Sequence, residues 1–318
     1  MKTRKNLFSA ALFLLGLAVL MVLASWLFYP KDNTLGDCGE DLLSDGFLAE
    51  PQQSLDLLVL GDSVPKYGVQ TPLLWCEYGI AGYTNAPAGS MIPKVLERAY
   101  SVFSRQTPKV VLLECNVLFR DSEPGYAAQL GVERLFPVLR FHDNWKYFSL
   151  GRLLRPVHYT EVMWEKGYYV CGRYQSVDRV PQKETRDELG KGVYERIQQL
   201  EALCRKNGAR LILFSLPSTQ NMNAARHDTL EQTAARLGIP YLDMNRDETV
   251  DIDWSTETEN GGDHLNYWGA QKATRALGDY LKGLNLLPDH RGEAAYAAWD
   301  ACEQIYEEPE RIPLEEWY

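Results

Sequence analysis

The sequence predicts an α/β fold: a three-layer α/β/α sandwich on a doubly wound parallel sheet, preceded by an N-terminal transmembrane helix. Apolar runs at residues 55–60, 110–113 and 210–216 have the pattern of strands that are buried on both faces of a parallel sheet. Segments with helical spacing lie between them, so strands and helices alternate along the chain. Residues 7–29 carry no charge over 23 positions, which is enough for a helix to cross a bilayer.

The uncharged run at residues 7–29 is predicted to be an uncleaved membrane anchor. Three basic residues precede it: Lys2, Arg4 and Lys5. By the positive-inside rule, they keep the N-terminus in the cytoplasm and place everything after Pro30 outside the cell. A cleaved signal peptide begins in the same way, but this run is longer than a typical signal core, and bulky side chains follow its small residues at 24–25. We therefore expect a single-pass protein of the cell membrane, with residues 1–30 as stub and anchor and an extracellular domain.

Length and composition leave room for one large domain with appendages. The 318 residues are 45% hydrophobic, which supports a sizeable core. The net charge of -10 argues against a nucleic-acid partner or an anionic-lipid partner. The charge is uneven, because residues 285–318 contain nine acidic residues against Arg291 and Arg311. These residues are predicted to form an acidic C-terminal tail, to which the sequence assigns no role.

All six cysteines follow the anchor and therefore face an oxidising compartment if the topology holds. Cys115 and Cys204 fall in apolar patterns and are expected to be buried free thiols. Cys38, Cys171 and Cys302 lie in loops or in the tail and are the better candidates for disulfides, although six cysteines allow 15 pairings. The sequence has no Cys-x-x-Cys motif and no His/Cys cluster, so neither a metal site nor a cofactor is expected.

The elements follow in order from the anchor. Polar, glycine-containing residues 31–53 are expected to form a juxtamembrane linker that packs only in part, and residues 54–284 the main domain. After the first strand we expect a short helix within 67–81, a second strand ending in the stretch 83–90, helices at 93–104, 188–207, 224–237 and 269–281, and a short strand at 240–243. The helix at 93–104 has apolar residues at helical spacing, and Pro108 follows its end.

Residues 117–187 interrupt the alternation and are rich in aromatic residues and arginines. A run of this length without regular strands is predicted to be an insertion over the functional edge of the sheet rather than a featureless loop. Aromatic faces suit sugar rings, and arginines suit anionic groups. The alternative is a helical cap whose aromatic side chains fill its own core. We expect that role for most of them and substrate contact for a few.

A polar turn, Gly61-Asp62-Ser63, follows the first strand directly. A serine at this point lies where open α/β sheets bind their ligands, and Pro65 suits the first turn of a helix that begins there. The unpaired backbone N–H groups of such a turn can face a developing oxyanion. Taken alone, the same tripeptide is also a common turn with a capping serine.

Two further motifs accompany this serine. The strand at 110–113 ends in Glu114-Cys115-Asn116, which places Asn116 at the same edge of the sheet as Ser63. Residues 262–270 read Gly-Asp-His-Leu-Asn-Tyr-Trp-Gly-Ala, a loop that carries His264 into the last predicted helix. Histidine titrates near neutral pH and can act as a general base.

Together these motifs resemble the SGNH (GDSL-like) hydrolase superfamily, whose fold is flavodoxin-like. More narrowly, the chain resembles the membrane-anchored SGNH proteins of Gram-positive bacteria, which are related to polysaccharide O-acetyltransferases and esterases. The resemblance covers residues 55–284. It implies a nucleophile at Ser63, a base at His264, and an oxyanion hole formed by the N–H groups of Ser63 and Gly89 with the amide of Asn116.

Three positions depart from the family pattern or allow another role. Gly89 is also compatible with a flexible turn, and Asn116 with a turn cap, because the Gly-x-Asn-Asp form of its block is missing. The family's acid stands two or three residues before the histidine, where this chain has glycines. We assign the acid to Asp263, which can orient His264 only if those glycines bend the backbone. The alternatives are Asp253, Glu257, Glu259, a backbone carbonyl, or a Ser-His dyad without an acid.

The resemblance implies an extracytoplasmic serine esterase or O-acyltransferase. Its substrates would be acyl, most simply acetyl, esters of a cell-envelope glycan, and its intermediate an acyl-serine. A transferase would need a separate membrane partner that supplies the acyl donor. The alternative is a catalytically inactive SGNH scaffold that serves as a glycan-binding or assembly module.

Overall fold

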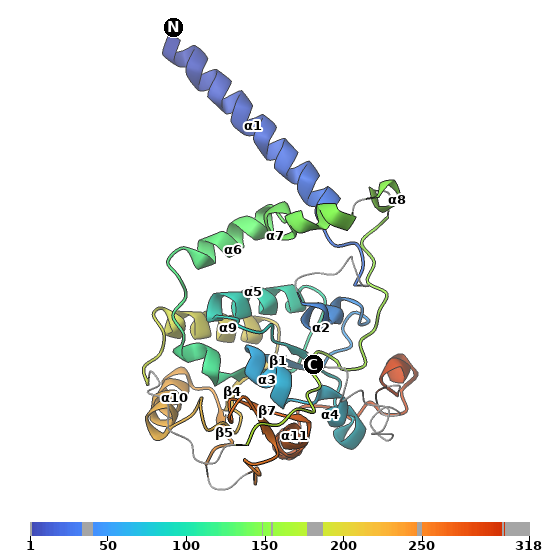
Figure 1. Ribbon diagram of the computed structural model, residues 1–318, viewed down its shortest axis with the longest axis vertical. Coiled ribbons are helices and arrows are strands. Elements are labelled where there is room, and N and C mark those ends of the chain that lie inside the picture. The colour runs from blue at the N-terminus through green and yellow to red at the C-terminus, as the bar shows by residue number, and fades with distance from the viewer. Residues whose placement is uncertain are drawn as a thin grey trace. The chain divides into compact units, whose positions relative to one another are not determined.

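The computed structural model describes residues 2–33, 41–147, 149–153, 155–176, 187–246, 250–300 and 302 (Figure 1). The chain divides into two compact units. Unit 1 comprises Met1–Leu42 and Pro124–Glu161, and unit 2 comprises Leu43–Glu123 and Val162–Tyr318.

Unit 1 is built on the long helix α1 (Lys2–Phe28). Its part Asn6–Phe28 is long and apolar enough to cross a membrane, with a mean hydropathy of 2.7. The other elements of the unit are α6 (Tyr126–Leu135), α7 (Val138–Phe141), the 3₁₀ helix η3 (His142–Tyr147) and α8 (Leu150–Leu153). Within this unit, α7 and η3 pack against the C-terminal end of α1.

Unit 2 contains a five-stranded, entirely parallel sheet in the order β2-β1-β3-β4-β5. Its strands are β1 (Leu57–Leu60), β2 (Gly82–Asn85), β3 (Val110–Glu114), β4 (Arg210–Ser215) and β5 (Tyr241–Asp243). This order is doubly wound, and the direction of the winding changes between β1 and β3. The predicted fold class is therefore confirmed.

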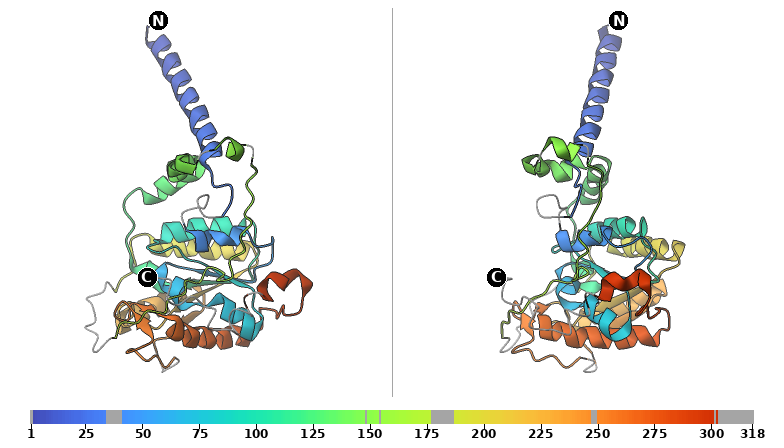
Figure 2. Two further views of the ribbon diagram at one scale, coloured as in Figure 1. Left: turned by 45° about the vertical axis from the view of Figure 1, so that its right-hand side comes forward. Right: turned by 90° about the vertical axis from the view of Figure 1, so that its right-hand side faces the viewer.

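Helices cover both faces of the sheet, as Figures 1 and 2 show. They are α3 (Ser63–Gly68), α4 (Thr71–Tyr78), α5 (Ile92–Phe103), α9 (Val193–Lys206), α10 (Ala224–Leu237) and α11 (Tyr267–Gly283). Side chains of β1 alternate between the layers: Leu58 and Leu60 join the core under α5 and α9, whereas Leu57 and Val59 join the core under α3 and α11. Because both faces are buried, the strand reads as a continuous apolar run.

Most predicted elements occur, with two differences near the sheet. The helix predicted at 188–207 begins only at Val193, because Gly192 before it adopts a left-handed backbone with φ of 71°. The single short helix predicted within 67–81 is two helices, α3 and α4. They are separated by the buried Gln70, whose amide donates to the Tyr168 hydroxyl (3.0 Å) and to the Tyr267 carbonyl (2.7 Å).

Both ends of unit 2 pack more closely than their composition predicts. The second half of the expected linker forms α2 (Leu42–Asp45) and the 3₁₀ helix η1 (Gly46–Leu48), in which Phe47 is buried. At the other end, the 3₁₀ helix η4 (Ala294–Tyr296) precedes the buried Trp299, whose ring packs 5.3 Å from that of Trp75. The remainder of the predicted acidic tail, residues 301 and 303–318, lies outside the described residues.

The cysteines follow the prediction only in part. Cys115 and Cys204 are buried free thiols, as expected. Cys171 and Cys302 are also buried free thiols, so the expectation of disulfides at these two positions was wrong. Each thiol is placed against an oxygen instead, that of Cys171 against the Glu259 carboxylate (2.7 Å) and that of Cys302 against the Trp164 carbonyl (3.2 Å). Cys38 lies outside the described residues.

The insertion predicted at 117–187 contributes to both units. Residues 124–161 belong to unit 1 and residues 162–176 to unit 2, while residues 177–186 lie outside the described residues. That the insertion covers the functional edge of the sheet stays a prediction.

Candidate active site

The turn after β1 delivers Ser63 to the carboxyl edge of the sheet. A Cβ atom at Gly61 would lie 2.6 Å from Cγ of Pro65, so the close turn requires glycine at this position. Asp62 caps α3, accepting a hydrogen bond from the Val64 N–H (3.0 Å), and Ser63 is the first residue of that helix. The hydroxyl therefore stands at the start of a helix, beside the point where the winding of the sheet reverses.

The structure brings Ser63 and His264 together across 200 residues of sequence. Nε2 of His264 lies 2.9 Å from Oγ of Ser63, a hydrogen-bonding distance. His264 is buried and Ser63 is half-buried. This geometry is that of a hydroxyl whose proton can pass to an adjacent imidazole.

His264 is held by a two-stranded hairpin and by the cap of α11. It belongs to β7 (His264–Leu265), which pairs antiparallel with β6 (Thr258–Glu259). Asn266 caps α11 by accepting from the N–H groups of Trp268 and Gly269, and its amide donates to the Thr256 carbonyl (2.8 Å). A Cβ at Gly269 would collide with the carbonyl oxygen of Glu257, so the close packing of α11 on this loop requires glycine.

Asp263 lies beside the far nitrogen of His264, with 3.3 Å between Oδ2 and Nδ1. The distance is that of an ion pair, but Nδ1 has no hydrogen-bond partner among the described residues. The two glycines before Asp263 do bend the backbone, with φ of 66° at Gly261 and 85° at Gly262. The condition under which Asp263 could approach the imidazole is therefore met, and its role as the acid stays a proposal.

A loop after β4 clamps the segment that carries Asp263. The side-chain amide of Asn221 donates to Oδ1 of Asp263 (2.6 Å) and to its carbonyl (3.1 Å). The hydroxyl of Ser218 donates to the Gly262 carbonyl (2.9 Å). Because Asn221 holds one carboxylate oxygen, the other is left on the side of His264.

The carboxylates considered as alternatives are engaged elsewhere. Glu259 stands opposite His264 in the hairpin, but it faces the Cys171 thiol and pairs with Arg173 (2.6 Å). Glu257 pairs with Lys272, and Asp253 accepts from the backbone N–H of Ser255 and from neighbouring hydroxyls. Among the described residues, Asp263 is the carboxylate within ion-pair distance of His264.

Asn116 lies in the 3₁₀ helix η2 (Cys115–Phe119), directly after β3. Its Nδ2 donates to Oδ2 of Asp62 (3.2 Å), and its Oδ1 accepts from Arg226 (3.4 Å). These two partners fix the orientation of the amide, with its nitrogen toward the residue that precedes Ser63. One N–H of the amide remains for a further acceptor, as a role in an oxyanion hole requires.

A buried charged cluster supports Asn116 from below. Asp62 is fully buried and pairs with Arg120 (2.9 Å), and Arg226 packs on the ring of Phe119 and donates to the Asn221 carbonyl (2.7 Å). Glu114 accepts from the Asn116 N–H (2.8 Å). Complete burial, together with the nearby Asp62, raises the pKa of Glu114 well above its usual value. Arg120 and Arg226 are thus the cations of this cluster, and Asp62 and Asp187 are carboxylates that face them.

Gly89 lies in the loop that follows β2, the strand next to β1. Its φ is 70°, and among the described residues, its chain neighbours apart, no heavy atom lies within 4 Å of the place that a Cβ would take. Its backbone is therefore suited to glycine and open to the surroundings. Its place at the same sheet edge as Ser63 is compatible with the predicted oxyanion role, which stays a proposal.

Tyr67 packs against the imidazole, and Tyr169 packs against Tyr67. The ring of Tyr67 lies 4.7 Å from that of His264 and 4.7 Å from that of Tyr169. Desolvation by burial, together with the nearby Tyr169, raises the pKa of Tyr67 to about 12, so its phenol stays protonated at neutral pH. The backbone N–H of Tyr169 donates to the Lys66 carbonyl (2.8 Å), which ties the end of the insertion to the helix of Ser63.

Several residues that support the site belong to none of the sequence motifs. Asn221 and Ser218 hold Asp263, and Arg226 and Arg120 brace Asn116 and Asp62. Only the positions of Ser218 and Asn221 could have indicated a role. Both residues follow β4 at the carboxyl edge of the sheet, where parallel strands gather functional groups.

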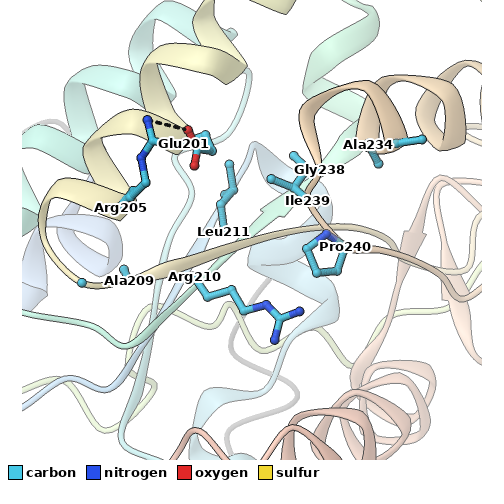
Figure 3. A pocket seen from close by; sticks show the side chains of 11 residues that line it. Glu201, Arg205, Ala209, Arg210, Leu211, Ala234, Gly238, Ile239 and Pro240 are labelled. Atoms are coloured by element: carbon cyan, nitrogen blue, oxygen red, sulfur yellow. Dashed lines mark ion pairs between the residues drawn. The ribbon is translucent and has the colours of Figure 1, made fainter.

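Other features of unit 2 lie away from this site. An open hollow of about 390 Å³ is lined partly by residues that precede β4 and β5, including Ala209, Ile239 and Pro240, so it opens at the opposite edge of the sheet (Figure 3). His227, Asp228 and Glu231 lie close enough to share a metal ion. However, Nδ1 of His227 is bonded to Asp243 (2.7 Å) and its Nε2 lies 2.6 Å from the Arg246 guanidinium, a cation that opposes a metal there.

No protein-family model and no curated protein matches this chain. Among solved structures, a GDSL-like lipase from Bacteroides thetaiotaomicron is 12% identical and covers 72% of this chain and 88% of its own, with a TM-score of 0.38. A lipase/acylhydrolase from Enterococcus faecalis is 11% identical over 72% and 97%, with a TM-score of 0.36. A mutant acetyl-xylooligosaccharide esterase from Geobacillus is 12% identical over 74% and 96%, with a TM-score of 0.35. TM-scores this low do not establish a function, so the function of this chain must be inferred from its own residues.

Proposed function

We propose that this chain is a membrane-anchored serine esterase or O-acyltransferase. The observation that carries the proposal is the 2.9 Å contact between Oγ of Ser63 and Nε2 of His264 at the carboxyl edge of a doubly wound sheet. Ser63 attacks the ester carbonyl, and His264 takes the proton of its hydroxyl and returns it to the leaving alcohol. Asp263 favours the charged imidazole, and the N–H groups of Ser63 and Gly89 with the Asn116 amide bind the oxyanion.

The substrate in this proposal is an acyl ester of a cell-envelope carbohydrate. An acyl-Ser63 intermediate can pass its acyl group to water or to a sugar hydroxyl, and the same residues serve both reactions. The uncharged part of α1, residues 7–28, and the basic residues Lys2, Arg4 and Lys5 at its N-terminal end support an extracytoplasmic location of unit 2. Transfer would require a partner in the membrane that delivers the acyl donor.

The first test is labelling of the full-length chain, in detergent, with a fluorophosphonate probe. An activated serine reacts, and Ser63→Ala and His264→Ala both abolish the labelling. Hydrolysis of p-nitrophenyl acetate should be lost in the same two variants. Labelling that persists in Ser63→Ala would place the reactive serine elsewhere and reject the proposal.

A second candidate is a non-enzymatic glycan-binding module on the same scaffold. The observation that favours it is Nδ1 of His264, which is buried without a hydrogen-bond partner among the described residues. This candidate predicts that a folded wild-type chain shows neither labelling nor hydrolysis. It also predicts that the chain binds glycan and that this binding survives Ser63→Ala.

A further inference from the structure

Four short helices of unit 1 lie at the C-terminal end of α1, and we call them the collar. The collar comprises α6, α7, η3 and α8. The Asn144 amide donates to the carbonyl of Phe28 (3.0 Å), and the ring of Phe141 packs edge-on against that of Tyr29, with 5.6 Å between centroids. Figure 1 shows α6 and α7 running crosswise to this end of α1.

The length of α1 sets the depth of the collar. The 23 residues of Asn6–Phe28 rise by about 1.5 Å each, roughly 34 Å in total, slightly more than the hydrocarbon core of about 30 Å. If α1 spans the membrane, as the proposed function holds, Phe28 and Tyr29 reach the headgroup layer. Asn144 and Phe141 of the collar, which contact these two residues, must then lie at the same depth. The inference below rests on that topology and not on catalysis.

The collar presents large apolar side chains to its surroundings. Leu135 is 70% exposed, Trp145 is 60% exposed and Leu150 is 77% exposed. Val132 and Leu139, which are also exposed, stand three residues before and four residues after Leu135. Leucines together with a tryptophan on short, crosswise helices are typical of segments that lie in the membrane interface.

The collar and the residues around it are also basic. Residues 124–161 contain three acidic residues and five basic ones, namely Arg134, Arg140, Lys146, Arg152 and Arg155. The negative charge of the chain is concentrated elsewhere, largely in residues 285–318. The net charge of -10 therefore does not exclude an anionic lipid at unit 1, because screening limits charge effects to about 8–10 Å.

A groove in the same unit adds a specific place for a lipid. Its volume is about 300 Å³, and its lining includes Trp26, Tyr29, Lys31, Arg155, Pro156 and Val157. The Lys31 ammonium lies 4.9 Å above the Trp26 ring and donates to the Trp26 carbonyl (2.9 Å). The Asp32 carboxylate also interacts with Arg155, so the groove has two cations against one carboxylate. This balance, beside an aromatic and aliphatic wall, suits a phosphate attached to a glycerol and its acyl chains.

We propose that unit 1 is an interfacial lipid-binding module. The collar rests in the headgroup layer of the outer leaflet through Leu135, Trp145 and Leu150. The groove takes an anionic phospholipid, whose phosphate pairs with Lys31 and Arg155 and whose glycerol and upper acyl carbons pack against Trp26, Tyr29 and Val157. α1 alone would anchor the chain, and the module would in addition fix the orientation of unit 1 on the membrane surface.

The test uses the full-length chain in vesicles of phosphatidylcholine and phosphatidylglycerol whose acyl chains are brominated either near the headgroup or near the bilayer centre. Bromine quenches nearby tryptophans. Trp145→Phe should lower the fraction of fluorescence that shallow bromine quenches. The matched control, Trp268→Phe, removes an exposed tryptophan of unit 2 and should not lower it. Trp26→Phe reports on α1 separately.

A second arm tests the groove. The chain is purified from vesicles in detergent, and the phosphatidylglycerol that it retains is measured. The double substitution Lys31→Met and Arg155→Glu should lower retention at least fivefold, whereas the exposed control Arg205→Glu, in unit 2, should leave it unchanged. Free glycerol phosphate should not displace the lipid.

The outcomes separate three cases. Equal quenching in wild type and Trp145→Phe overturns the collar and leaves its apolar face for a protein partner. Equal retention in the charge variant and its control overturns the groove. Loss of Trp26 quenching as well would mean that α1 does not enter the bilayer, which is a failure of the proposed topology and not of the module. None of these readouts depends on esterase activity.

Discussion

Replacement of Asp263 by asparagine tests the weakest contact of the proposed triad. The carboxylate lies 3.3 Å from Nδ1 of His264, lacks a hydrogen bond to it, and its side chain is 38% exposed. Two unit charges at this distance attract by about 1.3 kcal/mol in bulk water and about 5 kcal/mol at an effective dielectric constant of 20. An exposed carboxylate belongs near the lower value, since solvent screens it.

The expected loss for Asp263→Asn is therefore about tenfold in kcat/KM, because about 1.4 kcal/mol corresponds to one factor of ten. A buried, hydrogen-bonded acid is worth more, with asparagine in its place lowering kcat by about 10⁴-fold in a well-studied serine protease. The assay is hydrolysis of p-nitrophenyl acetate by the full-length chain. Asp253→Asn, an exposed aspartate of the same region, is the matched control and should retain wild-type activity.

Asn221 supplies a second check, because its amide holds Oδ1 of Asp263 at 2.6 Å. Asn221→Ala should lower activity by no more than Asp263→Asn, and the double variant should resemble Asp263→Asn alone, since both changes remove one interaction. A loss of a thousandfold or more in Asp263→Asn would refute the reasoning from exposure. Activity within twofold of wild type would remove Asp263 from the mechanism and leave a Ser-His dyad.

Three further predictions concern the surroundings of the site and the fold. Arg226→Met removes the donor to Asn116 and to the Asn221 carbonyl, so kcat should fall about 10- to 100-fold with little change in KM. This loss is smaller than the roughly 100- to 1000-fold loss expected when an oxyanion donor itself is removed. Arg226→Lys should recover part of the lost kcat, and an effect on KM alone would contradict this role. The folded-state pKa of Glu114 is raised, so the free energy of unfolding falls as pH rises from the unfolded pKa to the folded pKa, by about 1.4 kcal/mol for each unit between them. Thermal unfolding measures this: Glu114→Gln should lose less stability than wild type between pH 5 and pH 8, and parallel curves for the two proteins would refute the assignment. Trp299→Ala should destabilise unit 2 by about 3–5 kcal/mol, because the ring is buried against Trp75 and beneath the Lys166 ammonium. Chemical unfolding measures this free energy, and a loss below about 1 kcal/mol would mean that the segment around Trp299 is not part of the core.

The sheet could be predicted from the sequence because its strands are buried on both faces. Leu57, Leu58, Val59 and Leu60 alternate between two cores, so both sides of the strand must be apolar and the run stands out. The places of Ser63 and Asn116 follow from the same logic, since both residues come directly after parallel strands. The helix at 224–237 is marked by its asparagine cap and its terminal glycine.

The supports of the site could not be predicted, because they join segments that no local pattern connects. Asn221 and Asp263 lie 42 positions apart, and Arg226 reaches Asn116 across 110 positions. The wrong prediction for Cys171 has a related cause. A cysteine in an irregular segment is expected to be accessible for pairing, yet that segment is packed against β6, and the thiol is buried against Glu259.

The hairpin that carries His264 explains why the proposed acid, Asp263, stands next to the histidine and not two or three residues before it. β6 and β7 pair Glu259 with His264, so the chain must reverse within residues 260–263. Asn260, Gly261 and Gly262 all adopt positive φ in this reversal, and a side chain other than glycine pays roughly 1–2 kcal/mol for that conformation. The positions two and three before the histidine are thus committed to the turn. Asp263 is the first residue after the turn whose φ is not positive, and the Asn221 amide holds its carboxylate beside the imidazole.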